Sequence, residues 1–267
     1  GDLVAVDHLD LEVPKGGIVG FVGPNGSWKS TTIRMLLGLI TPTSGEAHVL
    51  GSSFAKPGAF AQRVGALIES PSFVPSLSAN ANLRSLAALR GLPSSRVDAV
   101  MEIVGLAGRG GDLTKNYSLG MKQRLAIAAA LLPDPELLIL DEPTNDLDTE
   151  TLDLLEDRLL EYDGTILMVS HDREFLNACA NRIAHVHDRI IDSYAGDYDS
   201  FERSRAERAL QQNQAFAQQQ AKPQKVSGRN PALDLAHHLQ GEAEALLEAD
   251  RFVGPEAVEA LAGQIVQ

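Results

Sequence analysis

The sequence has little cysteine, no long apolar run and no excess of basic residues, and each shortage excludes a class of protein. Cys179 is the single cysteine among 267 residues, which excludes a disulfide framework and is typical of a reducing cytosol. The longest apolar stretch, residues 125–140, is interrupted by two prolines and an aspartate at positions 133–135, so a membrane-spanning helix is not expected. The formal net charge is −13, which argues against a chain that coats nucleic acid, and no DNA partner is expected.

The N-terminal part predicts strands that lead into a loop and a helix. It has no basic segment followed by an apolar one, so no signal peptide is expected. LVAVDHLDLEV over residues 3–13 alternates as strands do, and GGIVGFVG over residues 16–23 predicts a short buried strand. KSTTIRMLLGLI over residues 29–40 has helical spacing and is ended by the proline and glycine of TPTSGE.

The middle of the chain alternates strands and helices. Residues 76–132 contain three helical segments separated by glycine or proline. ELLILDEP over residues 136–143 predicts a strand, TETLDLLEDRLLEY over 149–162 a helix capped by its first threonine, and GTILMVS over 164–170 another strand. This alternation predicts an α/β fold with a mainly parallel sheet, into which residues 76–132 are inserted as a helical subdomain.

Charge is distributed unevenly in the C-terminal part. Residues 201–230 are rich in glutamine and hold six basic residues against two acidic ones, which predicts a solvated basic helix. Residues 231–267 hold seven acidic residues against one arginine and predict two amphipathic helices. The expected organisation is a main domain over residues 1–195, a basic glutamine-rich arm over 196–230 and an acidic helical tail over 231–267.

The segment GPNGSWKST, residues 23–31, approximates the phosphate-binding pattern G-x-x-x-x-G-K-[ST]. In that pattern backbone N–H groups cradle phosphates and the lysine reaches the outer ones. Gly23, Lys29 and Ser30 fit, but Trp28 holds the position of the second glycine, which normally lets the backbone approach phosphate closely. Trp28 must point away or enter the phosphate space. It is therefore either a gate or stacking surface for the base, or the mark of a damaged loop with weakened ATP binding.

Two acids follow a buried strand. LLILDEP places Asp141 and Glu142 at the strand end, where the active sites of open α/β sheets gather. In NTPases with such loops the strand-end aspartate holds Mg²⁺ together with the loop hydroxyl, here Asp141 with Ser30. Glu142 is then placed to take a proton from the attacking water.

Three further motifs stand around these acids: YSLGMKQR at residues 117–124, TNDLD at 144–148, and His171 in MVSHDR. With the loop and the acids, in this order, they resemble the nucleotide-binding domain of ATP-binding cassette (ABC) proteins over about residues 2–195. The resemblance implies a P-loop NTPase fold of α/β class, with a mainly parallel sheet, N-terminal antiparallel strands, a helical subdomain insertion and a C-terminal helical extension. It also implies ATP hydrolysis with Mg²⁺ in a head-to-tail homodimer or heterodimer that holds two ATP molecules at its interface.

The resemblance assigns roles to individual positions. Contacts to ATP are implied for Gly23, Pro24, Asn25, Gly26, Ser27, Trp28, Lys29, Ser30, Thr31, Glu69, Ser118, Gly120 and Asp148. Ser30 and Asp141 match the contacts to Mg²⁺. Glu142 matches the catalytic glutamate, and His171 matches the switch histidine that senses the γ-phosphate.

Other positions match motifs that meet a partner. Ser118 and Gly120 match the signature loop, which caps the ATP of the opposite subunit, and residues 145–148 match the loop that crosses the dimer interface. Glu69 stands where most relatives carry a glutamine that couples the site to a partner. The aromatic that usually stacks on adenine would fall immediately before Gly1, so the chain is expected to be clipped there.

The resemblance leads to two main functional classes. Residues 23–145 are similar to ATPase subunits of drug and antibiotic exporters, which predicts a membrane-spanning partner and a cytoplasmic place on the inner face of the membrane. From residue 145 onward the sequence is more like ABC-F proteins, soluble factors that act on ribosomes, and the basic arm would then contact RNA. The exporter subunit is the favoured prediction. The alternatives are the ribosome factor and a non-hydrolysing protein on an ABC scaffold, which Trp28 keeps open.

Overall fold

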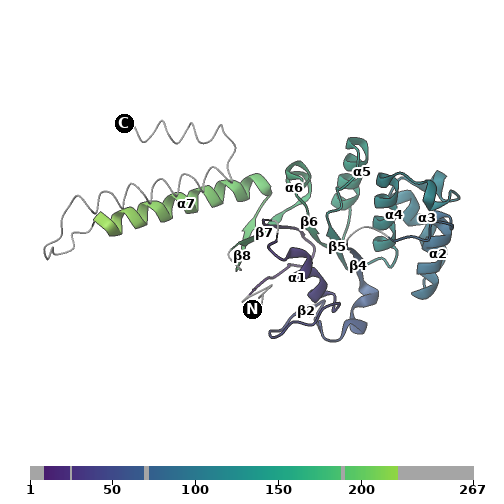
Figure 1. Cartoon of the computed structure of the whole chain (residues 1–267), viewed down its shortest axis with the longest axis horizontal. Helices are drawn as coiled ribbons and strands as arrows, with labels where there is room; N and C mark the ends of the chain where they lie inside the picture. The colour runs from purple at the N-terminus through teal and green to yellow at the C-terminus, as the bar shows by residue number, and fades with distance from the viewer. Residues whose placement is uncertain (1–8, 25, 69–71, 188–189, 222–267) are drawn as a thin grey trace. The chain divides into compact units, whose positions relative to one another are not determined.

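The computed structural model describes residues 9–24, 26–68, 72–187 and 190–221 and has the expected α/β architecture (Figure 1). Six strands form one sheet in the order β4-β5-β6-β1-β7-β8. They are β1 Ile18–Val22, β4 Val64–Leu67, β5 Leu137–Asp141, β6 Thr165–Val169, β7 Arg182–His187 and β8 Ile190–Ala195. All neighbours pair in parallel except β7 and β8, so the prediction of a mainly parallel sheet is confirmed.

Apolar cores lie on both faces of the sheet. Along β1 the residues alternate: Ile18 and Val22 belong to one buried cluster, and Val19 and Phe21 belong to the other. The first cluster contains residues of helices α4 (Leu119–Leu131), α5 (Thr149–Leu160) and α6 (Arg173–Cys179). The second contains Ile33 of helix α1 (Lys29–Leu36). Because both faces are covered, the central strands are apolar throughout, as parallel strands usually are.

The helical insertion contains the three helices that the sequence predicts. They are α2 Ala79–Leu89, α3 Ser95–Ile103 and α4, and Figure 1 shows them gathered beside the β4 side of the sheet. The Ser78 and Ser118 hydroxyls accept hydrogen bonds from the first turns of α2 and α4, which satisfies backbone donors that a helix start leaves free. Short 3₁₀ turns lie at Pro57–Ala59, Ala61–Arg63, Ala107–Arg109 and Thr114–Asn116.

Two local predictions are corrected. No strand occurs over residues 9–14, although Leu11 and Val13 pack against the core, and the earlier part of the predicted stretch, residues 3–8, lies outside the described residues. Antiparallel pairing in this region belongs instead to β2 (His48–Val49) and β3 (Ser52–Ser53). Helix α5 is capped by Asp148 rather than by Thr149, because the Asp148 carboxylate accepts from the Thr151 N–H at 2.9 Å.

The C-terminal part begins with helix α7, Tyr198–Ala221. The chain separates into two units, residues 1–209 and 210–267, and the structure describes the second only as the end of this helix. The acidic tail predicted over residues 231–267 and the end of the basic arm lie outside the described residues. Among the described helices, none is both long and apolar enough to cross a membrane.

Candidate functional site

The phosphate-binding loop connects β1 to α1, and among its described residues two, Gly26 and Trp28, are left-handed. Gly26 has φ 80°, which glycine adopts without strain. Gly23 is nearly extended, and a Cβ there would lie 2.7 Å from the Val186 carbonyl oxygen, so the closeness of β7 requires a glycine. Trp28 also has a left-handed backbone, φ 63°, and immediately precedes α1. For a residue with a Cβ this conformation costs about 1–2 kcal/mol.

The Lys29 side chain is held against the loop that precedes it. Its Nζ donates to the carbonyl oxygens of Gly23 at 2.8 Å and Pro24 at 3.1 Å, and lies 3.4 Å from the Ser27 Oγ. Only 8% of the residue is exposed. Burial lowers the pKa of the Lys29 ammonium, and the nearby carboxylates of Glu142 and Asp141 act in the opposite direction. The loop therefore holds the positively charged Lys29 ammonium near the carboxylates of Asp141 and Glu142.

Trp28 lines the same pocket as Lys29 and is 37% exposed. It does not pack away into the core. Its carbonyl oxygen accepts hydrogen bonds from the Thr32 N–H at 2.9 Å and from the Thr32 hydroxyl at 3.1 Å, which holds the left-handed turn in place. Trp28 therefore lies at the surface of this pocket and outside the buried core.

The two acids stand at the end of β5. Asp141 is its last residue and is 9% exposed. Glu142 follows with φ 50° and donates its N–H to the Val169 carbonyl oxygen at 2.9 Å, which ties the turn to β6. Burial raises the pKa of the Glu142 carboxyl, and the proximity of His171 opposes that shift. A carboxylate with a raised pKa beside a polar pocket is suited to accept a proton.

His171, which follows β6, contacts the Glu142 carboxylate, which follows β5. Its backbone N–H donates to the Glu142 Oε2 at 3.3 Å, and its ring Nε2 lies 3.4 Å from Oε1. The Thr144 and Ser170 hydroxyls are 3.2 Å apart and link the segments that follow the two strands. The parallel pairing of β5 and β6 thus brings together residues 29 positions apart in the chain.

These side chains share one pocket of about 400 Å³. It is lined by Gly26, Ser27, Trp28, Lys29, Ser30, Thr31, Gln123, Asp141, Glu142, Asn145, Asp146, Val169 and His171. Among the described residues, no group of three or more His, Cys, Asp or Glu forms a complete metal site. The Ser30 hydroxyl and the Asp141 carboxylate do fit Mg²⁺, which takes hard oxygen ligands and usually completes its shell with water and substrate phosphates.

Some predicted residues lie elsewhere. Ser118 and Asp148 cap α4 and α5 and, like Gly120, do not line this pocket. Gly23 and Pro24 act through their carbonyl groups on Lys29. Asn25 and Glu69 lie outside the described residues.

The sequence analysis assigned no role to Gln123. This residue is 8% exposed, and its Nε2 donates to the carbonyl oxygens of Glu142 at 3.1 Å and Pro143 at 3.3 Å. Near it, a Cβ on Gly120 would lie 2.9 Å from the Asp146 carbonyl oxygen, so α4 approaches the loop after β5 closely. The sequence could have indicated this position, because Gln123 follows Gly120 by three residues and therefore lies on the same face of the helix.

Comparisons of the sequence find the same motifs in known proteins. A family model described as ABC transporter matches residues 6–145, and a second with that description matches residues 184–227. The bacitracin transport ATP-binding protein BcrA of Bacillus licheniformis is 43% identical over 194 residues, which are 70% of this chain. The chain spans 63% of the length of that relative.

Comparisons of the structure agree on the fold. A solved structure of an ATP-binding subunit of an ABC transporter has a TM-score of 0.67 and 26% identity, over 76% of this chain and 87% of that one. A dimeric ATP-binding cassette in a post-hydrolysis state, bound to ADP and phosphate, has a TM-score of 0.61. At 24% identity, over 72% of this chain and 90% of that one, this second likeness shows the fold alone.

Proposed function

Because this chain belongs to the ABC transporter family, we propose that it is the ATP-binding and ATP-hydrolysing subunit of a drug or antibiotic exporter. One observation carries the proposal: Lys29, the Asp141–Glu142 pair and His171 line a single pocket. The name of the bacitracin transport relative supports export. This similarity to a transport protein favours the exporter over the ribosome-associated alternative.

The loop would bind the triphosphate. The Lys29 ammonium exchanges the Gly23 and Pro24 carbonyl groups for phosphate oxygens, and the first N–H groups of α1 add the partial positive charge of a helix start. Ser30 and Asp141 would hold Mg²⁺, which neutralises phosphate charge when bound. Trp28 narrows the space for the phosphates and so weakens ATP binding.

Hydrolysis would use Glu142 as general base. Its carboxylate takes a proton from the attacking water, while the His171 N–H and ring hold that carboxylate in place. Gln123 supports the turn at Glu142 and Pro143 through its two hydrogen bonds to their carbonyl oxygens. The chemistry is mostly positioning and charge stabilisation, as in other phosphoryl transfers.

A second chain would complete the site. Ser118 and Gly120 lie at the start of the 13-residue helix α4, outside the pocket of their own chain, and the adjacent Leu119 is 63% exposed. A helix start attracts phosphate, so we place these residues over the ATP of a partner cassette in a head-to-tail dimer. Asp148 and the residues before it would cross the interface between the two chains.

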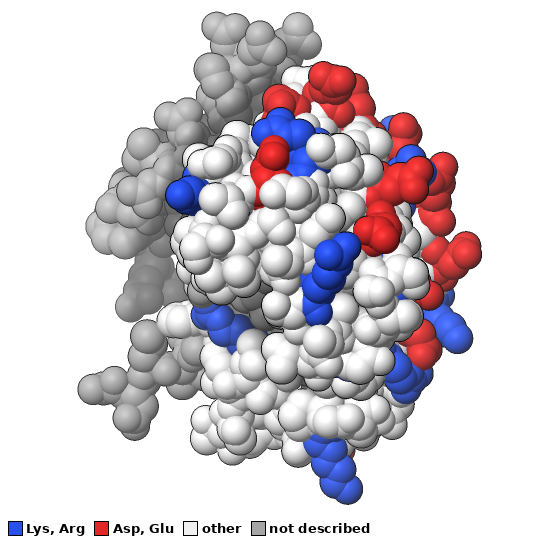
Figure 2. Space-filling view, turned by 90° about the vertical axis from the view of Figure 1, so that its right-hand side faces the viewer, with Lys and Arg blue, Asp and Glu red and all other residues white. Residues whose placement is uncertain are grey.

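The exporter proposal includes a membrane-spanning partner that meets the helical insertion. Four exposed large apolar side chains, Val74, Leu77, Leu86 and Leu89, belong to α2 and the segment before it. Figure 2 shows this end of the molecule, where the middle of the face carries few charged side chains and acidic ones gather at the top and right. Such a surface favours protein contact. The corresponding location is cytoplasmic, on the inner face of the membrane, with Glu69 coupling the site to the partner.

ATP titration tests the function. Trp28 is the single tryptophan of the sequence and lines the pocket, so its fluorescence reports ATP binding directly. We expect saturable quenching, and phosphate release that requires Mg²⁺. Lys29→Ala should remove both signals, whereas Lys56→Ala, outside the pocket, should keep them. Equal turnover in Lys29→Ala and the unmodified chain would contradict the proposal.

A further inference from the structure

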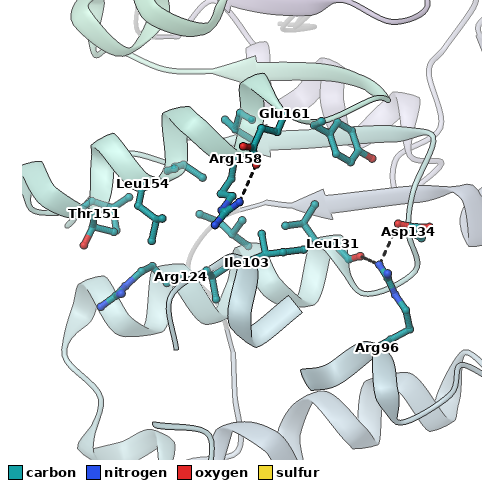
Figure 3. A pocket seen from close by; sticks show the side chains of 15 residues that line it. Arg96, Ile103, Arg124, Leu131, Asp134, Thr151, Leu154, Arg158 and Glu161 are labelled. Carbon is teal, nitrogen blue, oxygen red and sulfur yellow. Dashed lines mark hydrogen bonds and ion pairs between the residues drawn. The ribbon is translucent and has the colours of Figure 1, made fainter. Parts of the chain in front are cut away.

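A second pocket lies between the helical insertion and the core and shares no residue with the ATP pocket (Figure 3). Its walls come from α3, α4 and α5, and its volume is about 190 Å³. Apolar side chains form much of its lining, among them Ile103, Ile127, Leu131 and Leu154. The lining alone therefore favours a small hydrocarbon group.

Three arginines line this pocket, and two of them pair with carboxylates. Arg96 donates to the carbonyl oxygens of Leu132 at 3.2 Å and Leu131 at 3.1 Å, and pairs with Asp134 at 3.1 Å. Arg158 pairs with Glu161, one helical turn further on, at 2.8 Å. That second pair is exposed and hence weak, so Arg158 can turn to another anion at little cost.

Arg124 is the arginine whose hydrogen-bonding capacity is least used. Its Nε is buried from solvent and has no hydrogen-bond partner. Its Nη1 makes one long bond of 3.5 Å to the Gly105 carbonyl oxygen, and no carboxylate pairs with it within the described part of the chain. Figure 3 shows its side chain at the same end of the pocket as Thr151 of α5, opposite Arg96. A buried guanidinium N–H without a partner is costly, and an anionic ligand would remove that cost.

We propose that this pocket binds a small apolar carboxylate, with its hydrocarbon part against Ile103, Leu131 and Leu154 and its carboxylate on Arg124. A guanidinium group matches a carboxylate through two parallel hydrogen bonds, which a neutral or cationic head group cannot accept. The volume is below that of drug-sized sites and suits a ligand of about ten non-hydrogen atoms. Since α3 and α4 belong to the insertion and α5 to the core, the ligand would bridge the two.

Octanoate has the required size and charge and serves as the probe. Titration calorimetry of the full chain should show saturable binding with a dissociation constant of about 1 mM or below. Octylammonium should not bind measurably. Arg124→Met keeps the apolar stem and should weaken octanoate binding at least about tenfold. Arg109→Met removes an exposed arginine that pairs with Asp112 outside the pocket, and should leave the affinity within about twofold.

A second variant tests the position of the hydrocarbon part independently of charge. Leu154→Trp fills the pocket and should abolish binding, with thermal unfolding used to verify that the variant is folded. Absence of saturable octanoate binding up to about 10 mM would overturn the proposal. Unchanged affinity in Arg124→Met or in folded Leu154→Trp, or equal binding of octylammonium, would overturn it as well.

Discussion

Trp28 combines two unfavourable properties at one residue, a left-handed backbone and a bulky side chain beside the phosphate loop. The two affect different quantities. The backbone conformation lowers the free energy of unfolding whether or not nucleotide is present, whereas the indole is proposed to compete for space with the phosphates. Substitutions at this position can therefore separate them.

We expect Trp28→Gly to raise ATP affinity about tenfold or more, since it frees space in the pocket. Its unfolding free energy should rise by at most about 1 kcal/mol, because relief of strain is partly offset by the flexibility of glycine. Trp28→Ala is the matched control: it removes the indole but keeps a Cβ at φ 63°, so it should gain affinity without gaining stability. Titration with labelled ATP or calorimetry measures the ATP affinity. Identical affinities in the unmodified chain, Trp28→Gly and Trp28→Ala would refute the proposal that the indole competes with the phosphates.

As the proposed general base, Glu142 should determine how turnover depends on pH. Burial raises its pKa above the ordinary 4.5, and the residue acts as base only when ionised. Turnover should therefore fall as the pH decreases through this raised pKa, with the acid limb centred above pH 4.5. Glu142→Gln should lower kcat by about 100-fold or more and leave no acid limb from this group. Glu156→Gln is the control, because it removes another carboxyl with a raised pKa outside the pocket.

The same pKa shift predicts a change in stability. A carboxyl whose folded pKa is raised binds its proton more tightly in the folded state. Stability therefore falls as the pH rises from 4.5 through the folded pKa of Glu142. Glu142→Gln should then be more stable than the unmodified chain at neutral pH and equal to it under acid conditions. Urea unfolding at several pH values measures the difference, and a lower neutral-pH stability of the variant would argue against it.

At the scale of elements, the packing of α4 on β4 positions the start of α4 and Gln123 next to the loop that follows β5. The helix crosses the strand at Gly65, where a Cβ would collide with the backbone of Ala130 and lie 2.9 Å from the Pro135 Cγ. The collision partner is backbone, which cannot turn aside as a flexible side chain would. Gly65 therefore sets how closely helix and strand approach.

Gly65→Ala should lower the free energy of unfolding by about 1–3 kcal/mol, since it pushes α4 away from the sheet. Gly108→Ala is the matched control, because a Cβ at Gly108 meets no atom within 4 Å. Urea unfolding of both variants measures the effect. If the two substitutions cost the same, close packing of α4 on β4 is not what requires glycine at position 65.

At the scale of the whole molecule, the proposed head-to-tail dimer predicts that two inactive chains can repair each other. Lys29→Ala disables the loop side of a site. Leu119→Glu adds a negative charge at an exposed position of the signature loop, which opposes the phosphates of the partner's ATP. A mixed dimer contains one site with an intact loop from one chain and an intact signature from the other.

Equal mixing of the two variants should restore about one quarter of the unmodified turnover, because half of randomly formed dimers are mixed and each has one intact site of two. Phosphate release over a range of protein concentrations measures this. Lys29→Ala mixed with Glu142→Gln is the control, since both changes affect the same side of the site and no mixture repairs it. Failure of the first pair to regain turnover would contradict a shared site.

Much of the architecture follows from local patterns in the sequence. Continuous apolar runs predicted β1, β5 and β6, and helical spacing predicted α1 to α5, because burial on a regular element leaves a period in the sequence. The loop at residues 23–31 and the acids at 141–142 were recognisable from spacing alone. No prediction was made for β4, whose four residues include a glycine, and two motif positions, Asn25 and Glu69, stay predictions outside the described residues.

The sequence by itself determined most of the central elements and which residues are candidates for the chemistry, since both depend on neighbours a few positions apart. Only the tertiary structure decided what meets across the sheet. The strand order places β1 beside β6 and so brings residues 28–31 to the acids after β5, and close packing of α4 puts Gln123 under Glu142. It also decided that Asp148 caps α5 and that Arg124 lies at an apolar pocket. Such contacts depend on packing between segments that are distant in the sequence, and this packing produces no periodic pattern of apolar residues.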